Sequence, residues 1–145
     1  MDVRRIVTGV DEAGRSRVIT DAVLDNVVSR RPGHSSCVVW STAIDDTAAR
    51  AVATDAMPPT AIDDGTIFRV IDYQPGVAAR PHQTDSIDYI AVLAGEIDLE
   101  LDAETVRLHP GDVVVQRATM HNWINRGTEV CRLMVVLLGG REGAA

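Results

Sequence analysis

The stretches GVAARPHQTDSIDYIAVLAG at residues 76–95 and GDVVVQRATMHNWIN at residues 111–125 decide the fold of this chain. Each starts at a glycine, contains a histidine and carries β-branched residues that favour a strand. Between them, EIDLEL at residues 96–101 alternates apolar and acidic residues, which predicts a half-buried strand. Residues 102–104 form a predicted turn, and residues 106–108 return as the partner strand of a hairpin.

Further strands are expected on both sides of this hairpin. They are predicted at residues 66–73, 89–93, 113–115 and 132–138. The valine run at 113–115 is expected to be buried, and the apolar run at 132–138 to be covered on both faces. The acidic side chains of Glu96, Asp98 and Glu100 are expected to form a solvated outer face. Short strands at this spacing are typical of an all-β sandwich or barrel.

The 145 residues are expected to form a single domain. We predict a barrel over residues 63–138, a β-rich N-terminal arm over residues 1–62 that packs on it, and a tail at 139–145. Strands within the arm are expected at residues 4–8, 17–20 and 38–42. Residues 21–30 fit a helical face as well as a strand, and residues 45–60 fit one helical turn followed by an extended loop.

Composition excludes several classes of partner. The net charge is −7, from 14 basic residues, all of them arginine, against 21 acidic ones. Nucleic acid and anionic membranes are therefore not expected partners. No apolar run is long enough to span a membrane, and the N-terminus lacks a signal-peptide core. Cys37 and Cys131 are expected to be buried free thiols of a cytoplasmic protein.

The first stretch resembles the first motif of the cupin superfamily. That motif places a glycine, a His-x-His pair, a glutamate and a second glycine at fixed spacings. Gly76, His82, Thr84, Asp88 and Gly95 occupy these positions with every spacing kept. Two identities differ, because Thr84 replaces the second histidine and Asp88 replaces the glutamate.

The second stretch resembles the second cupin motif less closely. Gly111 opens it, and His121 and Asn125 keep the spacing of its histidine and asparagine. Arg117 and Thr119 replace its proline and second glycine, and the loop is one residue shorter. The resemblance implies a jelly-roll barrel (a double-stranded β-helix), as in small single-domain bacterial cupins, and a homodimer.

The resemblance also implies one divalent transition metal, which cupins usually bind through three histidines and a glutamate. His82, Asp88 and His121 would form a set of two imidazoles and one carboxylate, suited to Fe, Zn, Ni or Mn. His82, Thr84 and Asp88 share one face of a continuous strand. Asp85 is a second carboxylate in this loop that could act as ligand or base. A degenerate site without metal is the alternative.

Four residues are candidates for substrate binding. Arg80 could hold a substrate carboxylate bidentately, and Thr84 offers a hydroxyl group. Trp123 could line the cavity or simply pack in the core. Arg117 lies near the predicted mouth of the site, although a salt bridge to a carboxylate is the favoured interpretation of it. His109 is expected to be exposed.

The function expected from these features is a metal-dependent enzyme acting on a small carbonyl- or carboxylate-containing metabolite. Lewis-acid catalysis is expected, in which the metal polarises the carbonyl oxygen and Asp85, Asp88 and His121 have catalytic roles. The reaction would be of a lyase or isomerase type (dehydration, isomerisation or decarboxylation) and could belong to secondary metabolism. An Fe(II)-dependent dioxygenase, a metal-free binding or sensing module and a purely structural protein are the alternatives.

Overall fold

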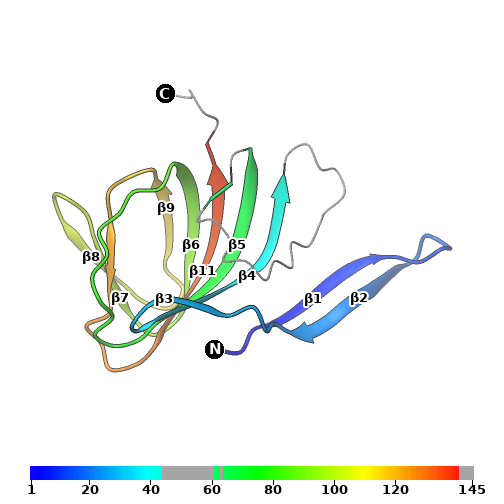
Figure 1. Cartoon of the computed structure of the whole chain (residues 1–145), viewed down its shortest axis with the longest axis horizontal. Coiled ribbons are helices and arrows are strands. Elements are labelled where there is room, and N and C mark those ends of the chain that lie inside the picture. Colours follow the sequence, from blue (N-terminus) through cyan, green and yellow to red (C-terminus); the bar gives the residue numbers. More distant parts are fainter. Residues whose placement is uncertain (44–60, 63, 141–145) are drawn as a thin grey trace.

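The computed structural model describes residues 1–43, 61–62 and 64–140, and within them the chain forms β-strands and no helix (Figure 1). In chain order the strands are β1 (Arg4–Val10), β2 (Ser16–Val23), β3 (Val28–Arg31), β4 (His34–Ala43), β5 (Gly65–Tyr73), β6 (Ser86–Ala94), β7 (Ile97–Glu100), β8 (Thr105–Leu108), β9 (Val113–Arg117), β10 (Asn122–Ile124) and β11 (Cys131–Gly139). The predicted helical turn and loop at 45–60 lie outside the described residues. In the described part of the chain, no helix is long and apolar enough to cross a membrane.

Two sheets enclose the core. One has six strands in the order β3-β4-β5-β11-β6-β9, and the other has three in the order β10-β7-β8. All the pairings are antiparallel. Apolar side chains of both sheets meet in a single cluster that includes Ile67, Ile97 and Leu133. The expectation of an all-β jelly-roll fold is confirmed.

The predicted hairpin and the last strand are found where the sequence places them. Ile97 pairs with Leu108 and Glu100 with Thr105. β11 lies between β5 and β6 in the centre of the large sheet. The two cysteines are both buried and free, as predicted.

Two expectations about burial are wrong. The run at 113–115 is not buried: Val113 is 77% exposed and Val115 64% exposed, because β9 is an edge strand with one face toward solvent. The acidic face is not simply solvated either, because Asp98 is only 5% exposed.

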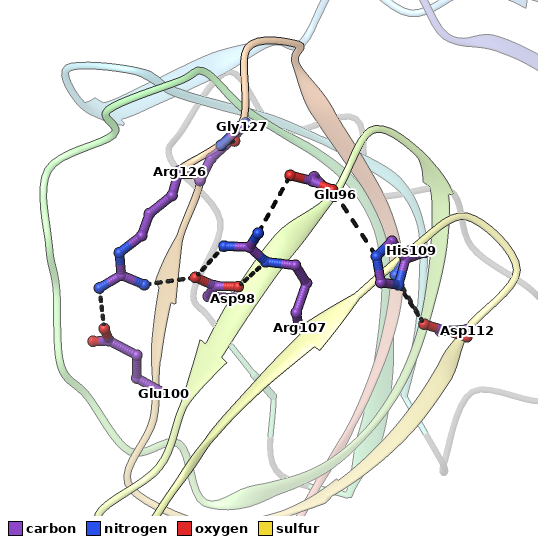
Figure 2. A network of polar contacts seen from close by, with 9 residues as sticks. Glu96, Asp98, Glu100, Arg107, His109, Asp112, Arg126 and Gly127 are labelled. Atoms are coloured by element: carbon purple, nitrogen blue, oxygen red, sulfur yellow. Dashed lines mark hydrogen bonds and ion pairs between the residues drawn. The ribbon is translucent and has the colours of Figure 1, made fainter.

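Asp98 is the centre of an ion-pair network on the small sheet (Figure 2). Arg107 donates from Nε to its Oδ1 over 2.8 Å, and Arg126 donates from Nη1 to its Oδ2 over 2.6 Å. Arg126 also reaches Glu100 Oε1 over 2.7 Å. Hydrogen bonding to Arg107 holds the pKa of the Asp98 carboxyl below its usual value. The network ties β7 to β8 and to the segment after β10.

The predicted N-terminal arm divides into two parts. β1 and β2 form a hairpin that projects from the body of the molecule (Figure 1). β4 instead pairs with β5 from His34 to Ala43 and belongs to the large sheet. Residues 21–30 hold the end of β2 and the start of β3, so the alternative of a helix there is not observed.

Glycines fix the turns at the motif positions. Gly76, Gly95 and Gly111 have φ angles of 70°, 69° and 94°, in the left-handed region that disfavours side chains. A Cβ at Gly95 would also collide with the carbonyl oxygen of Val130. The turn from β6 into β7 therefore requires glycine.

Candidate active site in the barrel cavity

A cavity lies inside the barrel and is lined by residues from both sheets. The volume that the centre of a water molecule can occupy in this cavity is about 70 Å³. At roughly 10–15 Å³ for each water position, this is room for about five to seven waters or one small organic molecule. Trp123, Ile90 and Leu133 form apolar parts of its wall. The site therefore suits a compact ligand.

Two histidines are paired on the cavity wall. His82 and His121 form an isolated antiparallel bridge in which each backbone N–H donates to the other's carbonyl over 2.9 Å. This pairing places the imidazole centroids 4.3 Å apart, with an angle of 55° between the rings. Two segments that are far apart in sequence thus bring their imidazoles into contact.

Backbone carbonyls fix the tautomer of both rings. His82 Nδ1 lies 2.8 Å from the carbonyl oxygen of Arg80, and His121 Nδ1 lies 2.8 Å from that of Thr119. A carbonyl oxygen only accepts hydrogen bonds, so each Nδ1 carries the proton. Burial lowers the pKa of both histidines, which favours neutral rings. Each Nε2 therefore keeps a lone pair.

Gln116 connects Asp88 to His121. Its Nε2 donates to Asp88 Oδ2 over 2.9 Å and lies 3.3 Å from His121 Nε2, so the two amide hydrogens serve both partners. Ser86 Oγ donates to the other oxygen of Asp88 over 2.6 Å. Burial raises the pKa of the Asp88 carboxyl, and the bonds from Ser86 and Gln116 oppose that shift. The unit holds a buried carboxylate beside the histidine pair.

The cavity collects most of the predicted site residues. The lining includes Arg80, His82, Thr84, Asp88, His121 and Trp123. Trp123 is 4% exposed and also belongs to the core cluster, so both interpretations of it hold. The chain bends at Asp85, yet His82, Thr84 and Asp88 still reach the same cavity.

Two predicted residues do not reach the cavity. Asp85 is exposed, and its carbonyl oxygen accepts from the N–H of Gly140 over 3.1 Å. Arg117 is exposed on the face of β9 opposite Gln116. Neither belongs to the lining, because the bend at Asp85 and the alternation of β9 turn their side chains outward.

The predicted metal ligands are not assembled as a set. In the described residues, no group of three or more His, Cys, Asp and Glu side chains could hold a metal ion. Asp88 is engaged by Ser86 and Gln116, and Gln116 also occupies the lone pair of His121 Nε2. The lining carries four arginines against one carboxylate, which opposes the binding of a further cation.

Sequence reasoning missed one wall of the cavity. His34 and Ser36 of β4, Arg30 and Arg31 of β3, and Arg69 of β5 line it. Pairing between distant strands brings these residues to the site, and no local motif marks them. The inward direction of Gln116 could have been predicted from the sequence of β9. Strand residues alternate between the two faces, so Gln116 lies opposite the exposed Val113 and Val115.

Comparison with known proteins agrees with this architecture. A family model for the cupin domain matches residues 69–137. A cupin-domain-containing oxidoreductase of Aspergillus ruber is 34% identical, over 94% of this chain and 72% of the relative. A phomopsin biosynthesis cluster protein of Diaporthe leptostromiformis is 36% identical, over 84% of this chain and 70% of the relative. The cupin domain of Schizosaccharomyces pombe Cnp3 superposes with a TM-score of 0.57 at 15% identity, over 94% of this chain and 87% of that domain. The chain belongs to the cupin family.

Proposed function

We propose that this chain is an enzyme that moves a proton on a small carbonyl compound held in the barrel cavity. The observation that carries the proposal is the pair of imidazoles, His82 and His121, fixed as Nδ1–H tautomers on the cavity wall. A neutral imidazole with a free lone pair is a general base at neutral pH. Relatives named as biosynthesis cluster proteins support a biosynthetic intermediate as the substrate.

The reaction starts at His82. Its Nε2 takes the proton from the carbon next to the carbonyl group, the C–H electron pair becomes a carbon–carbon double bond, and the negative charge moves to the carbonyl oxygen. Where the carbon that lost the proton also carries a hydroxyl group, the hydroxyl proton passes to the carbonyl oxygen, the proton on His82 returns to the former carbonyl carbon, and the isomerisation is complete. If the next carbon bears a hydroxyl group, its C–O bond breaks instead, and the departing hydroxide takes the proton from His82 as water. Either outcome is of the isomerase or lyase type.

The neighbouring groups support this step. Asp88 faces the same cavity and favours a positive charge on His82 while the proton resides there. Gln116 and Ser86 hold that carboxylate in place. The arginines of the lining stabilise the negative oxygen, which develops in a buried, low-dielectric site.

Deuterium exchange tests the proposal without knowledge of the natural substrate. Proton NMR would follow loss of the C3 protons of pyruvate and 2-oxobutanoate in D₂O, under nitrogen and with EDTA. We expect the chain to accelerate exchange by about 10²-fold or more, the usual range for a positioned base. His82→Ala should lose the acceleration, and His109→Ala, outside the cavity, should keep it. Equal rates for wild type and His82→Ala would refute the proposal.

Oxidation is a second candidate, favoured by the names of the relatives. Proteins from Aspergillus ruber and Neurospora crassa are described as cupin-domain-containing oxidoreductases, at 34% and 42% identity. A net oxidation needs an electron acceptor, which dioxygen with Fe(II) would supply. Oxygen consumption after anaerobic addition of Fe(II) would favour this candidate, whereas exchange that persists in EDTA would favour proton transfer.

A further inference from the structure

The lining of the cavity carries a concentration of positive charge that the proton-transfer step does not by itself require. Arg30, Arg31, Arg69 and Arg80 line the cavity, and Asp88 is the single carboxylate in the lining. The chain as a whole has a net charge of −7. A cationic cavity in an acidic protein favours entry of a small anion and disfavours cations.

His34 adds a buried polar atom to the same wall. It is 7% exposed, and its Nδ1 has no hydrogen-bond partner. Its ring packs edge-on against Tyr73, with centroids 5.5 Å apart. An unpartnered buried polar atom is costly unless a ligand satisfies it. Burial and the charges of Arg31, Arg30 and Arg80 lower the pKa of His34 to about 4, so the ring is neutral at pH 7.

Arg31 is held in position by the backbone and by Tyr73. It pairs with His34 across the turn between β3 and β4. Its Nε donates to the carbonyl oxygen of Ala78 over 3.0 Å, and its guanidinium carbon lies 5.8 Å from the centroid of the Tyr73 ring. Arg31 also donates a hydrogen bond to the Tyr73 hydroxyl, so these contacts use two of the five N–H groups and one face of the guanidinium. The other N–H groups of the terminal nitrogens are the donors that a ligand would meet.

Arg80 is fixed through its backbone. Its N–H donates to Asn122 Oδ1 over 2.8 Å, and its carbonyl accepts from His82 Nδ1 over 2.8 Å. The residue is exposed and also belongs to the lining of the cavity. Arg80 therefore has two roles: its carbonyl sets the tautomer of His82, and its side chain brings a guanidinium group to the cavity.

We propose that Arg31 and Arg80, together with His34 as its Nδ1–H tautomer, bind the carboxylate of a small organic anion, so that the substrate is a short oxo acid. The subsite rests on the proposed function for the role of His82, which meets the carbon next to the carbonyl. The volume of about 70 Å³ limits the ligand to a few heavy atoms beyond the carboxylate. Guanidinium groups match carboxylate geometry and form its stronger hydrogen bonds.

Calorimetric titration with oxalate, malonate and pyruvate tests the subsite, with methyl pyruvate as the uncharged control. We expect the anions to bind with a Kd of about a millimolar or tighter and methyl pyruvate to bind at least tenfold more weakly. Arg31→Gln and Arg80→Gln should each weaken binding about tenfold or more, and Arg31→Lys should recover part of the loss. Arg107→Gln, on the outer network, is the matched control and should bind like wild type.

The two proposals fail in different ways. Anion binding should survive in His82→Ala, which removes the base but leaves the subsite. Binding without exchange would overturn the proposed function and leave the subsite in place. Exchange on butanone as fast as on pyruvate, or anion affinity unchanged in both Arg31→Gln and Arg80→Gln, would overturn the subsite. Tighter binding of inorganic phosphate than of every carboxylate would also overturn it.

Discussion

Gln116 shows how one amide can set the chemistry of a site. It donates to Asp88 and to His121 at once, which fixes the orientation of the amide and keeps the lone pair of His121 engaged. His82, whose Nδ1 is tied to Arg80, is then the ring that serves as the base. At this scale the division of roles between two similar histidines follows from a single neighbour.

Removal of that amide should destabilise the fold. Gln116→Leu leaves the buried Asp88 carboxylate with only the bond from Ser86. We expect the free energy of unfolding to fall by about 1–3 kcal/mol, the cost of an unsatisfied buried polar group. Urea denaturation would measure it. Gln83→Leu, at an exposed amide bonded to the carbonyl of Ala118, is the control and should cost clearly less. Equal losses would contradict the role of Gln116.

His34 should make stability depend on pH. In the unfolded chain its pKa is near 6.5, and in the folded chain it is about 4. Between these values the unfolded chain binds a proton that the folded chain does not, so the free energy of unfolding falls as the pH decreases from 6.5 to 4. The expected loss is about 3 kcal/mol.

Denaturation at several pH values compares wild type with His34→Gln. The variant should lose this part of the slope between pH 6.5 and 4, and His109→Gln, at an exposed histidine, should keep the wild-type slope. A His34→Gln slope equal to that of wild type would mean that His34 is accessible to protons in the folded state.

Individual strands show which parts of the structure can be predicted from sequence. The hairpin of β7 and β8 could be predicted, because strict alternation and a short turn are local signals. The burial of Asp98 could not, because Arg126 comes from a distant segment. Arg31, His34 and Arg69 could not be predicted as cavity residues for the same reason, because distant strand pairing brings them there. His82 and His121 could be predicted, because they keep the spacing of the two cupin motifs. Edge strands such as β9 resemble buried strands in composition until the strand order is known.

The turn after β9 contains a strained residue. Ala118 has a φ of 48°, at a position next to the proline and glycine of the family motif. A left-handed conformation costs an L-residue about 1–2 kcal/mol, and glycine avoids this cost. The greater conformational freedom of glycine in the unfolded chain offsets about 0.5–1 kcal/mol of the gain. Ala118→Gly should therefore stabilise the fold by up to about 1 kcal/mol. Ala103→Gly, in an exposed turn without a positive φ, should destabilise it, and the same sign in both variants would contradict the argument.

Asp98 should contribute more to the stability of the fold than a solvent-exposed acidic residue would. Asp98→Asn removes the charge that Arg107 and Arg126 share, and we expect a loss of roughly 1–2 kcal/mol at pH 7. Because its pKa is lowered in the folded state, the contribution exists above the ordinary aspartate pKa of 3.8 and disappears as the pH falls below it. Asp21→Asn, in the exposed pair with Arg4, should change the melting temperature less. A loss in Asp98→Asn that persists at pH 2 would contradict the charge argument.

At the scale of the molecule, the homodimer implied by the family stays a prediction. The outer face of β6 and β9 exposes Tyr89, Val113 and Val115, which are 49%, 77% and 64% exposed. Tyr89 and Val115 are direct cross-strand partners, so these side chains adjoin on one face. Exposed apolar patches of this kind often mark association sites.

Sedimentation equilibrium would test the dimer. We expect a dimer at micromolar concentration and a shift toward monomer in Val115→Glu. Glu in place of the exposed Val10, on the projecting hairpin, is the comparison. A wild-type monomer at all concentrations would contradict the prediction. Dissociation in Val10→Glu alone would mean that the dimer forms through the projecting hairpin and not through β6 and β9.

The central claim is that His82 and His121 present unprotonated Nε2 atoms to a cavity built for a small anion. Long-range ¹H–¹⁵N NMR of the histidine rings at pH 7 tests it directly, since the ¹⁵N shift distinguishes protonated, free and metal-bound nitrogens. We predict that both rings are Nδ1–H tautomers with unprotonated Nε2 atoms, that of His121 accepting a hydrogen bond from Gln116, and that the spectra are identical before and after EDTA. Nε2-protonated or doubly protonated rings, or a spectrum that changes on chelation, would contradict the account.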